Sequence, residues 1–195
     1  MKKLVLASSN PGKLREIRAL LPMGVASQDE LGIGEADEPH ATFLENALAK
    51  ARHASRAAGL PALADDSGLC VEALGGEPGV NSACYAGRDG RREERDARNN
   101  EKLLKSISDN RKAYYCCVMV LVRRPDDPRP LVAEGLWHGE IARAPRGANG
   151  FGYDPLFFIR ELRKTAAELD PDEKNRISHR GKALAHLIQE LKDAG

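Results

Sequence analysis

The segment L-V-L-A-S-S-N-P-G-K, residues 4–13, joins a strand pattern directly to a helix start. The four apolar residues at 4–7 predict a short buried strand. Asn10 is a favoured N-cap residue, and Pro11 falls at the first helical position, where its missing N–H costs no hydrogen bond. We therefore expect a helix from here to about Leu21, and a strand followed at once by a helix favours an α/β protein.

The clearest helical pattern follows a T-x-x-E capping box made by Thr42 and Glu45. Residues at helical spacing then mark one face that is mostly alanine: Leu44, Ala47, Leu48, Ala51, Ala54 and Ala58. Gly59 and Pro61 end the pattern. Such small side chains predict close packing of this helix on its neighbour.

Further along the chain, short strands alternate with helices. We expect strands at residues 61–64 and 69–71, a charged helix over 91–105, and a strand at 113–122. A tight turn, P-D-D-P-R-P, then leads to a hairpin partner at 131–141, and a last helix runs from 178 to about 192. Hairpins among helices predict a mixed sheet flanked by helices, and with no repeat or linker we expect one domain over residues 1–195.

Composition limits the class of protein. The 195 residues include 30 Lys+Arg and 29 Asp+Glu, and the resulting net charge of +1 disfavours a nucleic-acid coat or a membrane-surface binder. The four cysteines form no C-x-x-C pair. The apolar run at 4–7 is too short for a signal peptide, and no stretch has the ~18 apolar residues of a membrane span. We expect a cytoplasmic protein.

Cations occupy two predicted helix starts, where the helix dipole disfavours them. Lys13 lies in the first turn after Asn10, and His179 and Arg180 follow Ser178, with Lys174 shortly before. The free N–H groups of such a helix start suit a phosphate, which would reverse the penalty. The alternatives are a solvated lysine at the first start and an ordinary surface neutralised by nearby acids at the second.

Asp65-Asp66-Ser67-Gly68 follows an apolar strand. Successive strand side chains point to opposite faces, so only one of the two aspartates is expected to face a shared cleft. A carboxylate there would bind magnesium or take a proton from water. The alternative is a hairpin turn, which D-S-G also favours. Asp37 and Glu38 are either further magnesium ligands or part of a solvated loop.

Residues 147–154 form a glycine-rich loop that carries aromatic side chains. Glycines allow backbone to approach a ligand, and an aromatic ring offers a stacking face to a base. The alternative is a turn anchored by core aromatics, above all Phe157 and Phe158.

Five motifs occur in order: S-S-N-P-G-K, D-D-S-G-L, G-G-E-P-G, F-G-Y-D-P and S-H-R-G. Together they resemble the inosine triphosphate pyrophosphatase family over essentially the whole chain, although Ser8-Ser9-Asn10 stands where many members have Thr-Gly-Asn. The resemblance implies an elongated α/β fold of two lobes with a central cleft, a homodimer and dependence on Mg²⁺. It also implies hydrolysis of ITP, dITP and XTP, small-molecule purine nucleoside triphosphates, to the monophosphate and pyrophosphate.

The resemblance also implies roles for individual residues. Asp66 would be the general base and a magnesium ligand, with Glu38 as second ligand. The triphosphate would be held by Ser8, Ser9, Asn10, Pro11, Gly12 and Lys13. Ser67 would contact substrate, and the nucleotide with its base would be bound by Phe151, Gly152, Tyr153, Asp154, Lys174, His179 and Arg180.

Two other functions fit the same motifs. One is a related pyrophosphatase for other modified nucleotides, which a substrate panel would separate. The other is a nucleotide-binding sensor without turnover, which would bind nucleotide and release no pyrophosphate. A nucleic-acid-binding module is disfavoured, because the chain has no basic stripe.

Overall fold

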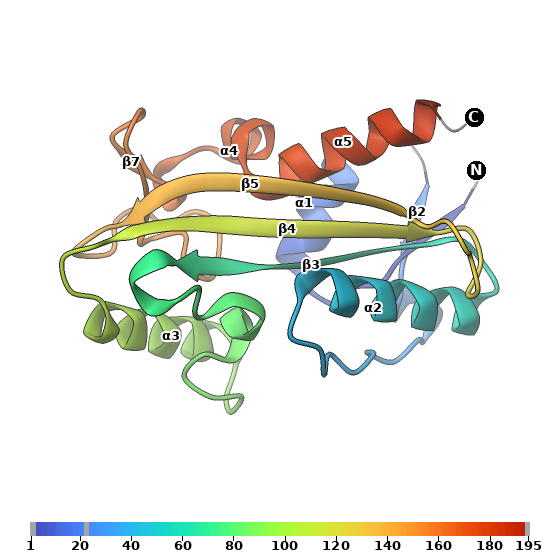
Figure 1. Ribbon diagram of the computed structural model, residues 1–195, viewed down its shortest axis with the longest axis horizontal. Coiled ribbons are helices and arrows are strands. Elements are labelled where there is room, and N and C mark those ends of the chain that lie inside the picture. Colours follow the sequence, from blue (N-terminus) through green and yellow to red (C-terminus); the bar gives the residue numbers. More distant parts are fainter. Residues whose placement is uncertain (1–2, 22–23, 194–195) are drawn as a thin grey trace. The chain divides into compact units, whose positions relative to one another are not determined.

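A mixed sheet runs through the part of the chain that the computed structural model describes, residues 3–21 and 24–193. Its strands, in sheet order, are β2 (Val25–Ser27), β1 (Leu4–Leu6), β3 (Ala62–Val71), β4 (Lys112–Val122), β5 (Leu131–Ile141), β6 (Phe157–Ile159) and β7 (Lys164–Thr165). β1 pairs in parallel with β2 and β3, whereas β6 pairs antiparallel with β5 and β7. The predicted α/β class with a mixed sheet is confirmed, and β4 and β5 are neighbours whose arrows point in opposite directions, as a hairpin requires (Figure 1).

The helices follow the predicted order with one addition. They are α1 (Pro11–Leu20), α2 (Phe43–Ala58), α3 (Arg92–Ser106), α4 (Pro171–Ile177) and α5 (His179–Asp193), with short 3₁₀ segments η1 (Asp29–Leu31), η2 (Glu72–Leu74), η3 (Gly79–Cys84) and η4 (Ala166–Glu168). α4 was not predicted, although Asp170 caps it and Pro171 opens it, both ordinary helix-start residues. None of the described helices is both long and apolar enough to cross a membrane.

β3 differs from its prediction, because it is one continuous strand of ten residues. The split into two strands and the hairpin turn at residues 65–68 are therefore both wrong. Every residue of β3 except Ser67 is buried. Asp65 and Asp66 are tolerated inside the strand because each has a cationic partner, Lys13 and Lys50 respectively, so that neither carboxylate is buried uncompensated.

The chain divides into two compact units, and β3, β4 and β5 contribute residues to both. The first unit comprises the described residues among 1–66, 117–135 and 179–195, and the second comprises residues 67–116 and 136–178. The central cleft and the single domain over residues 1–195 stay predictions.

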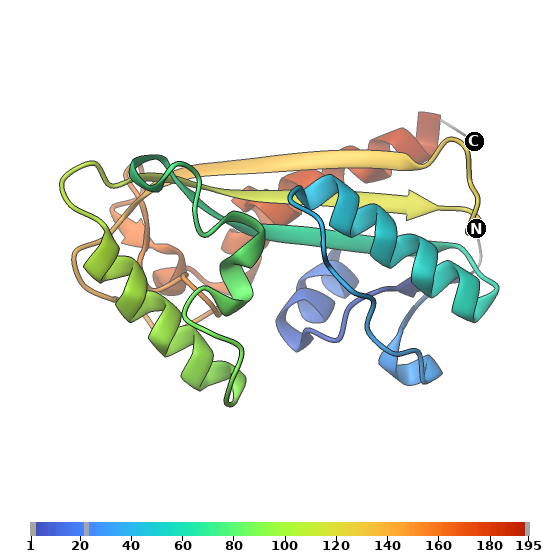
Figure 2. The same ribbon diagram turned by 60° about the horizontal axis from the view of Figure 1, so that its bottom comes forward.

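In the first unit, helices lie on both faces of the strands. Figure 2 shows α2 in front of the strands and α5 behind them, and α1 packs against α5. The α2 face is the predicted alanine face, with Ala47, Ala51 and Ala54 fully buried, so the helix approaches β1 closely. Leu44, in the first turn of α2, was predicted on this face but is 44% exposed. The predicted cap is present, with Thr42 Oγ1 accepting from the Glu45 N–H.

The second unit has an aromatic core. Trp137 and Phe157 have ring centroids 5.0 Å apart, and Tyr115 lies 4.6 Å from Phe157. Leu103 of α3 joins this cluster, which anchors the C-terminal part of that helix. Phe157 is thus a core residue, while Phe158 is half-buried with the guanidinium of Arg146 over its ring.

One glycine sets how closely α5 approaches the sheet. A Cβ on Gly135 of β5 would lie 2.1 Å from the carbonyl oxygen of His179 and 2.5 Å from the backbone nitrogen of Ala183. Both atoms are backbone, so a side chain at position 135 displaces the first turn of α5 itself.

We expect Gly135→Ala to lower the free energy of unfolding by about 3 kcal/mol, the upper end of overpacking costs. Urea unfolding measures it. Gly34→Ala is the matched control, since a Cβ at Gly34 meets nothing within 4 Å. Equal stability of the two variants would contradict the close approach.

Candidate active site

The start of α1 has the predicted cap, but its N–H groups are already used. Asn10 Oδ1 accepts from the backbone N–H groups of Gly12 and Lys13, at 3.0 and 3.2 Å, and the Leu14 N–H donates to the Asn10 carbonyl. Pro11 has no N–H to offer. The expectation of free N–H groups for a phosphate at this helix start is therefore wrong, because the cap satisfies them within the chain.

The two serines before the cap also have partners. Ser8 Oγ accepts from the Asn10 N–H, and Ser9 Oγ donates to Asp29 and accepts from the side chain of Gln28. These contacts hold the loop between β1 and α1 in one conformation. The cation of this segment is the side chain of Lys13, which contacts Asp65.

Asp65 and Asp66 point to opposite faces of β3, as strand alternation predicts. Asp65 Oδ2 lies 2.8 Å from Lys13 Nζ, on the face covered by α1 and α5. Asp66 Oδ1 lies 3.2 Å from Lys50 Nζ of α2, on the other face. The alternation thus gives the two neighbouring carboxylates different contacting cations, although Lys13 and Lys50 each act electrostatically on both.

On the α1 and α5 face, charges alternate in a buried network. Arg180 forms an ion pair with Glu16 of α1, and its Nε lies 3.6 Å from Asp65 Oδ2. The side chain of Arg180 is 3% exposed and that of Asp65 is fully buried. Two cations, Lys13 and Arg180, therefore balance two carboxylates, and the alternatives of a solvated lysine and an ordinary surface are wrong.

The network shifts the acidity of its members. Burial would raise the pKa of Asp65, but the cations of Lys13 and Arg180 hold it well below its ordinary value. Burial would also lower the pKa of Arg180, and the carboxylates of Glu16 and Asp65 raise it instead. Asp65 therefore stays ionised, so it anchors cations and cannot act as a base near neutral pH.

On the α2 face, Lys50 lies between two carboxylates. Its ammonium contacts Glu38 as well as Asp66, and Asn46, one turn earlier on α2, donates to Asp66 Oδ2 at 3.3 Å. Burial alone would lower the pKa of Lys50, but the neighbouring carboxylates, Asp66 first among them, raise it above its ordinary value. Lys50 is therefore a permanent cation, and two donors fix the orientation of the Asp66 carboxylate.

These neighbours also change the pKa of Asp66. Its burial raises the pKa above the ordinary aspartate value, and Lys50 only partly offsets this, while the nearby Glu38 adds to the rise. A carboxylate with a raised pKa is a stronger proton acceptor than an ordinary one. Asp66 is thus held in a fixed orientation, with a pKa above the ordinary aspartate value.

The predicted magnesium ligands, Glu38 and Asp66, are two carboxylates that lie close together, as ligands of one divalent cation must. Both reach the same ammonium, and the group of Glu38, Asp66 and Lys50 carries a net charge of −1 when ionised. Among residues 3–21 and 24–193, no cluster of three or more His, Cys, Asp or Glu forms a protein-only metal cage. Mg²⁺ is usually bound by one or two carboxylates plus substrate phosphates, so two carboxylates suffice.

In the second unit, the predicted nucleotide-binding loop is held by a buried ion pair. Asp154 Oδ2 accepts from Lys174 Nζ at 2.7 Å and from the Phe151 N–H at 2.8 Å. Both partners of the pair are less than 10% exposed. Lys174 also lies 5.0 Å from the centroid of the Phe151 ring. Lys174 and Asp154 therefore fix the backbone that carries Phe151.

The other predicted residues differ in what they offer. Tyr153 is a core residue whose hydroxyl donates to the Ser82 carbonyl at 2.9 Å, and burial raises its pKa. Ser67 is half-buried in β3 next to Asp66, and His179 is buried at the start of α5. Phe151 is half-buried, so it is the more exposed of the two aromatic residues in this loop. Substrate contacts by these residues stay predictions.

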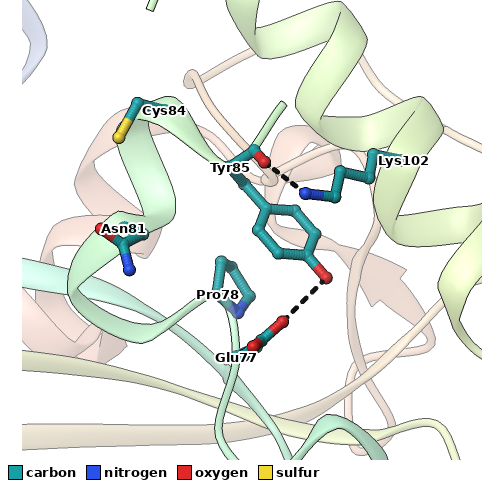
Figure 3. Close-up of a pocket in the computed structure, with 6 residues that line it drawn as sticks. All are labelled: Glu77, Pro78, Asn81, Cys84, Tyr85 and Lys102. Carbon is teal, nitrogen blue, oxygen red and sulfur yellow. Dashed lines mark hydrogen bonds between the residues drawn. The ribbon is translucent and has the colours of Figure 1, made fainter. Parts of the chain in front are cut away.

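A pocket of about 260 Å³ in the second unit lies among other residues (Figure 3). Its lining consists of Glu77, Pro78, Asn81, Cys84, Tyr85 and Lys102. Lys102 Nζ donates to the Tyr85 carbonyl at 2.6 Å and lies 3.9 Å from the centre of the ring. Because none of these six is a predicted site residue, the pocket does not identify the site.

Sequence reasoning missed Lys50, Asn46 and Glu16, which complete the surroundings of the two aspartates. Asn46 and Lys50 are one turn apart on α2, a spacing that puts two polar side chains together beside the alanine face. That spacing was a usable signal. Glu16 gave none, because its partner Arg180 lies 164 positions away.

The Asp65 network gives a pH-dependent stability. Because the folded-state pKa of Asp65 is lowered, its contribution is present above the ordinary pKa of about 3.9 and is lost as pH falls through the folded value. We expect Asp65→Asn to lower the free energy of unfolding by about 3–5 kcal/mol at pH 7, since it leaves buried cations uncompensated. The difference from wild type should narrow below about pH 4.

Urea unfolding at several pH values measures this difference. Asp126→Asn is the control, because Asp126 forms an exposed pair with Arg124 and should change stability little at any pH. A difference for Asp65→Asn that is independent of pH would contradict the network.

The chain is similar to known proteins in both sequence and structure. The chain is 62% identical to the dITP/XTP pyrophosphatase of Burkholderia pseudomallei, over 97% of this chain and 93% of the relative. It is 60% identical to the dITP/XTP pyrophosphatase of Nitrosomonas europaea, over 99% and 96%. The solved structure of a HAM1 protein from Coxiella burnetii superposes with a TM-score of 0.90 at 47% identity, covering 99% of this chain and all of that one.

The Staphylococcus aureus Ham1 protein superposes with a TM-score of 0.87 at 38% identity, over the full length of both chains. The sequence profile of the Ham1 family matches residues 4–190. These matches confirm the family to which the five sequence motifs point. The chain belongs to the Ham1 family.

Proposed function

We propose that this protein hydrolyses the non-canonical purine nucleotides ITP, dITP and XTP to the monophosphate and pyrophosphate, and so removes them from the nucleotide pool. The names of relatives at 60–62% identity support this substrate class. The observation that carries the proposal is Asp66, a buried carboxylate that is held by Asn46 and Lys50 beside Glu38.

Asp66 acts as the general base in this proposal. It takes a proton from water, the water oxygen attacks the α-phosphorus, and the bond from phosphorus to the bridging oxygen breaks. That oxygen leaves with the pyrophosphate, and the new P–O bond stays with the monophosphate. Lys50 and Asn46 keep the carboxylate oriented while it accepts the proton.

Glu38 and Asp66 would hold Mg²⁺. The bound ion would supply charge neutralisation to the phosphate oxygens. The chain itself supplies the net negative charge of the group and two carboxylates close enough to contact one ammonium, that of Lys50.

Lys13 is the cation best placed for the triphosphate. Its side chain is 14% exposed, and an ammonium has three donors, so it can keep its contact with Asp65 and bind a phosphate oxygen as well. Arg180 is more deeply buried and is engaged by Glu16 and Asp65. We assign Lys13 to direct phosphate contact and Arg180 to the charge balance that supports it.

Phe151 offers the stacking face for the base, held by Lys174 and Asp154. Donors that meet the 6-oxo group of hypoxanthine or xanthine would be left unpaired by the amino group of adenine, which costs several kcal/mol. The family resemblance also supports a cytoplasmic homodimer, and sedimentation at several concentrations checks the dimer.

A product assay tests the function. With ITP, dITP, XTP, GTP and ATP in parallel, we expect pyrophosphate release from the first three, at a kcat/KM well above that for GTP and ATP. Release of orthophosphate from ITP would contradict the reaction, and a preference for other modified nucleotides would favour the related pyrophosphatase.

We expect Asp66→Asn to lower kcat by about 10²–10⁴-fold, the usual contribution of a general base, while nucleotide still binds. Glu45→Gln is the control, because Glu45 is an exposed carboxylate at the start of the neighbouring helix. Steady-state pyrophosphate release and calorimetric binding of ITP measure the two effects. Turnover near the wild-type rate in Asp66→Asn would remove Asp66 from the mechanism.

Metal dependence is tested separately. We expect chelation of divalent cations to abolish turnover and added Mg²⁺ to restore it. Glu38→Gln should raise the Mg²⁺ concentration for half-maximal rate about tenfold or more, because it removes one of two carboxylate ligands. Asp37→Asn, at the exposed neighbouring acid, should leave that concentration unchanged. Equal effects of the two substitutions would contradict the assignment of Glu38.

A further inference from the structure

Two side chains one turn apart on α3 bind both polar backbone groups of Gly152. The Gly152 N–H donates to Asp96 Oδ2 at 2.9 Å, and Asn100 Nδ2 donates to the Gly152 carbonyl at 2.9 Å. Spacing of four residues puts Asp96 and Asn100 on the same face of the helix. A residue that is bonded at both its N–H and its carbonyl has both of its flanking peptide planes fixed.

The same helix face continues to the neighbouring ring. Arg92, one turn before Asp96, has its guanidinium 4.8 Å from the centroid of the Phe151 ring, and its Nε lies 3.8 Å from Asp96 Oδ2. Asn100 Nδ2 also donates to the Asp96 carbonyl at 2.9 Å, which orients its amide. Asp96 and Asn100, which we call the α3 pair, thus hold the Phe151–Gly152 segment from the helix side.

The buried pair of Lys174 and Asp154 also holds this segment, because Asp154 accepts from the Phe151 N–H. Gly150 and Gly152 both have positive φ, at 76° and 63°, a backbone region that glycine adopts freely. Without the α3 pair, a segment with such glycines has many accessible conformations, so ordering it would cost free energy at each binding event.

The α3 pair is not needed to anchor α3 itself. Leu103 packs in the aromatic core, and the buried Asn99 bonds to the Ala86 N–H and to the carbonyls of Ser82 and Ala83. Asp96 and Asn100 are only half-buried. Removing either side chain therefore leaves the packing of the helix in place.

We infer that Asp96 and Asn100 are positioning residues that preorganise the Phe151–Gly152 segment for the base of a purine nucleotide, and so set the affinity for the base half of the substrate. The inference rests on the proposed function, in which Phe151 offers the stacking face. The α3 pair bonds to the backbone of Gly152 within the second unit, whereas Lys13, Asp65 and Asp66 belong to the first unit. Its loss should therefore weaken binding of the base and leave phosphate binding unchanged.

The experiment compares Asp96→Ala and Asn100→Ala with Asp96→Asn, whose side-chain oxygen still accepts from the Gly152 N–H. Calorimetry gives the Kd of IMP and of pyrophosphate separately, and steady-state kinetics give kcat and KM for ITP. For both alanine variants we expect about a tenfold rise in the Kd of IMP and in KM, the usual size of one lost hydrogen bond. The Kd of pyrophosphate and kcat should stay within twofold of wild type.

Two controls separate positioning from folding. Glu101→Ala, on the exposed face of α3 where Glu101 pairs with Lys105, should leave every constant unchanged. Hydrogen exchange of the Gly152 amide should be faster in Asp96→Ala and close to wild type in Asp96→Asn, independently of any nucleotide.

The outcomes are distinct. Wild-type release of pyrophosphate from ITP, with unchanged IMP affinity in both alanine variants, would overturn the inference and leave the proposed function standing. A parallel loss of IMP and pyrophosphate affinity would also overturn it, because that pattern reports general damage. A wild-type protein that releases no pyrophosphate from ITP would overturn the proposed function and this inference with it.

Discussion

The buried carboxylate of Asp65 is the constraint on which the first unit depends. A charge inside a strand is tolerated only where cations compensate it, and here Lys13 of α1 and Arg180 of α5 both reach the same oxygen. Glu16 balances the second cation, so that two helices and a central strand are joined through one neutral network. Close approach of α5 to the sheet at Gly135 brings Arg180 within reach.

That network also determines what Asp66 can do. Because successive residues of a strand point to opposite faces, Asp65 contacts Lys13 and Arg180 on one face and Asp66 contacts Lys50 on the other. There, burial and Glu38 raise the pKa of Asp66, and the ammonium of Lys50 offsets part of that rise. Two adjacent aspartates thus differ in acidity, one with a lowered pKa and one with a raised pKa, through their surroundings alone.

The second unit achieves order in a different way. Its loop at residues 147–154 contains glycines, which favour turns and also favour disorder. The buried ion pair of Asp154 and Lys174 holds one part of the loop, and Asp96 and Asn100 of α3 hold the backbone of Gly152. Preorganisation of this kind lowers the entropic cost of binding, so it bears on affinity as much as on stability.

The amino-acid sequence by itself determined what depends on near neighbours: the strand and capped helix at residues 4–13, the cap at Thr42, the alanine face of α2 and the five motifs that mark the family. It also predicted that Asp65 and Asp66 would be separated, since alternation is a property of any strand. Only the tertiary structure decided that residues 62–71 form one strand, that Asn10 uses the first N–H groups of α1, and which cation meets which carboxylate. The reason is physical: a buried charge is stabilised by whatever the fold brings within a few ångströms, and Arg180 and Glu16 are 164 positions apart in the chain.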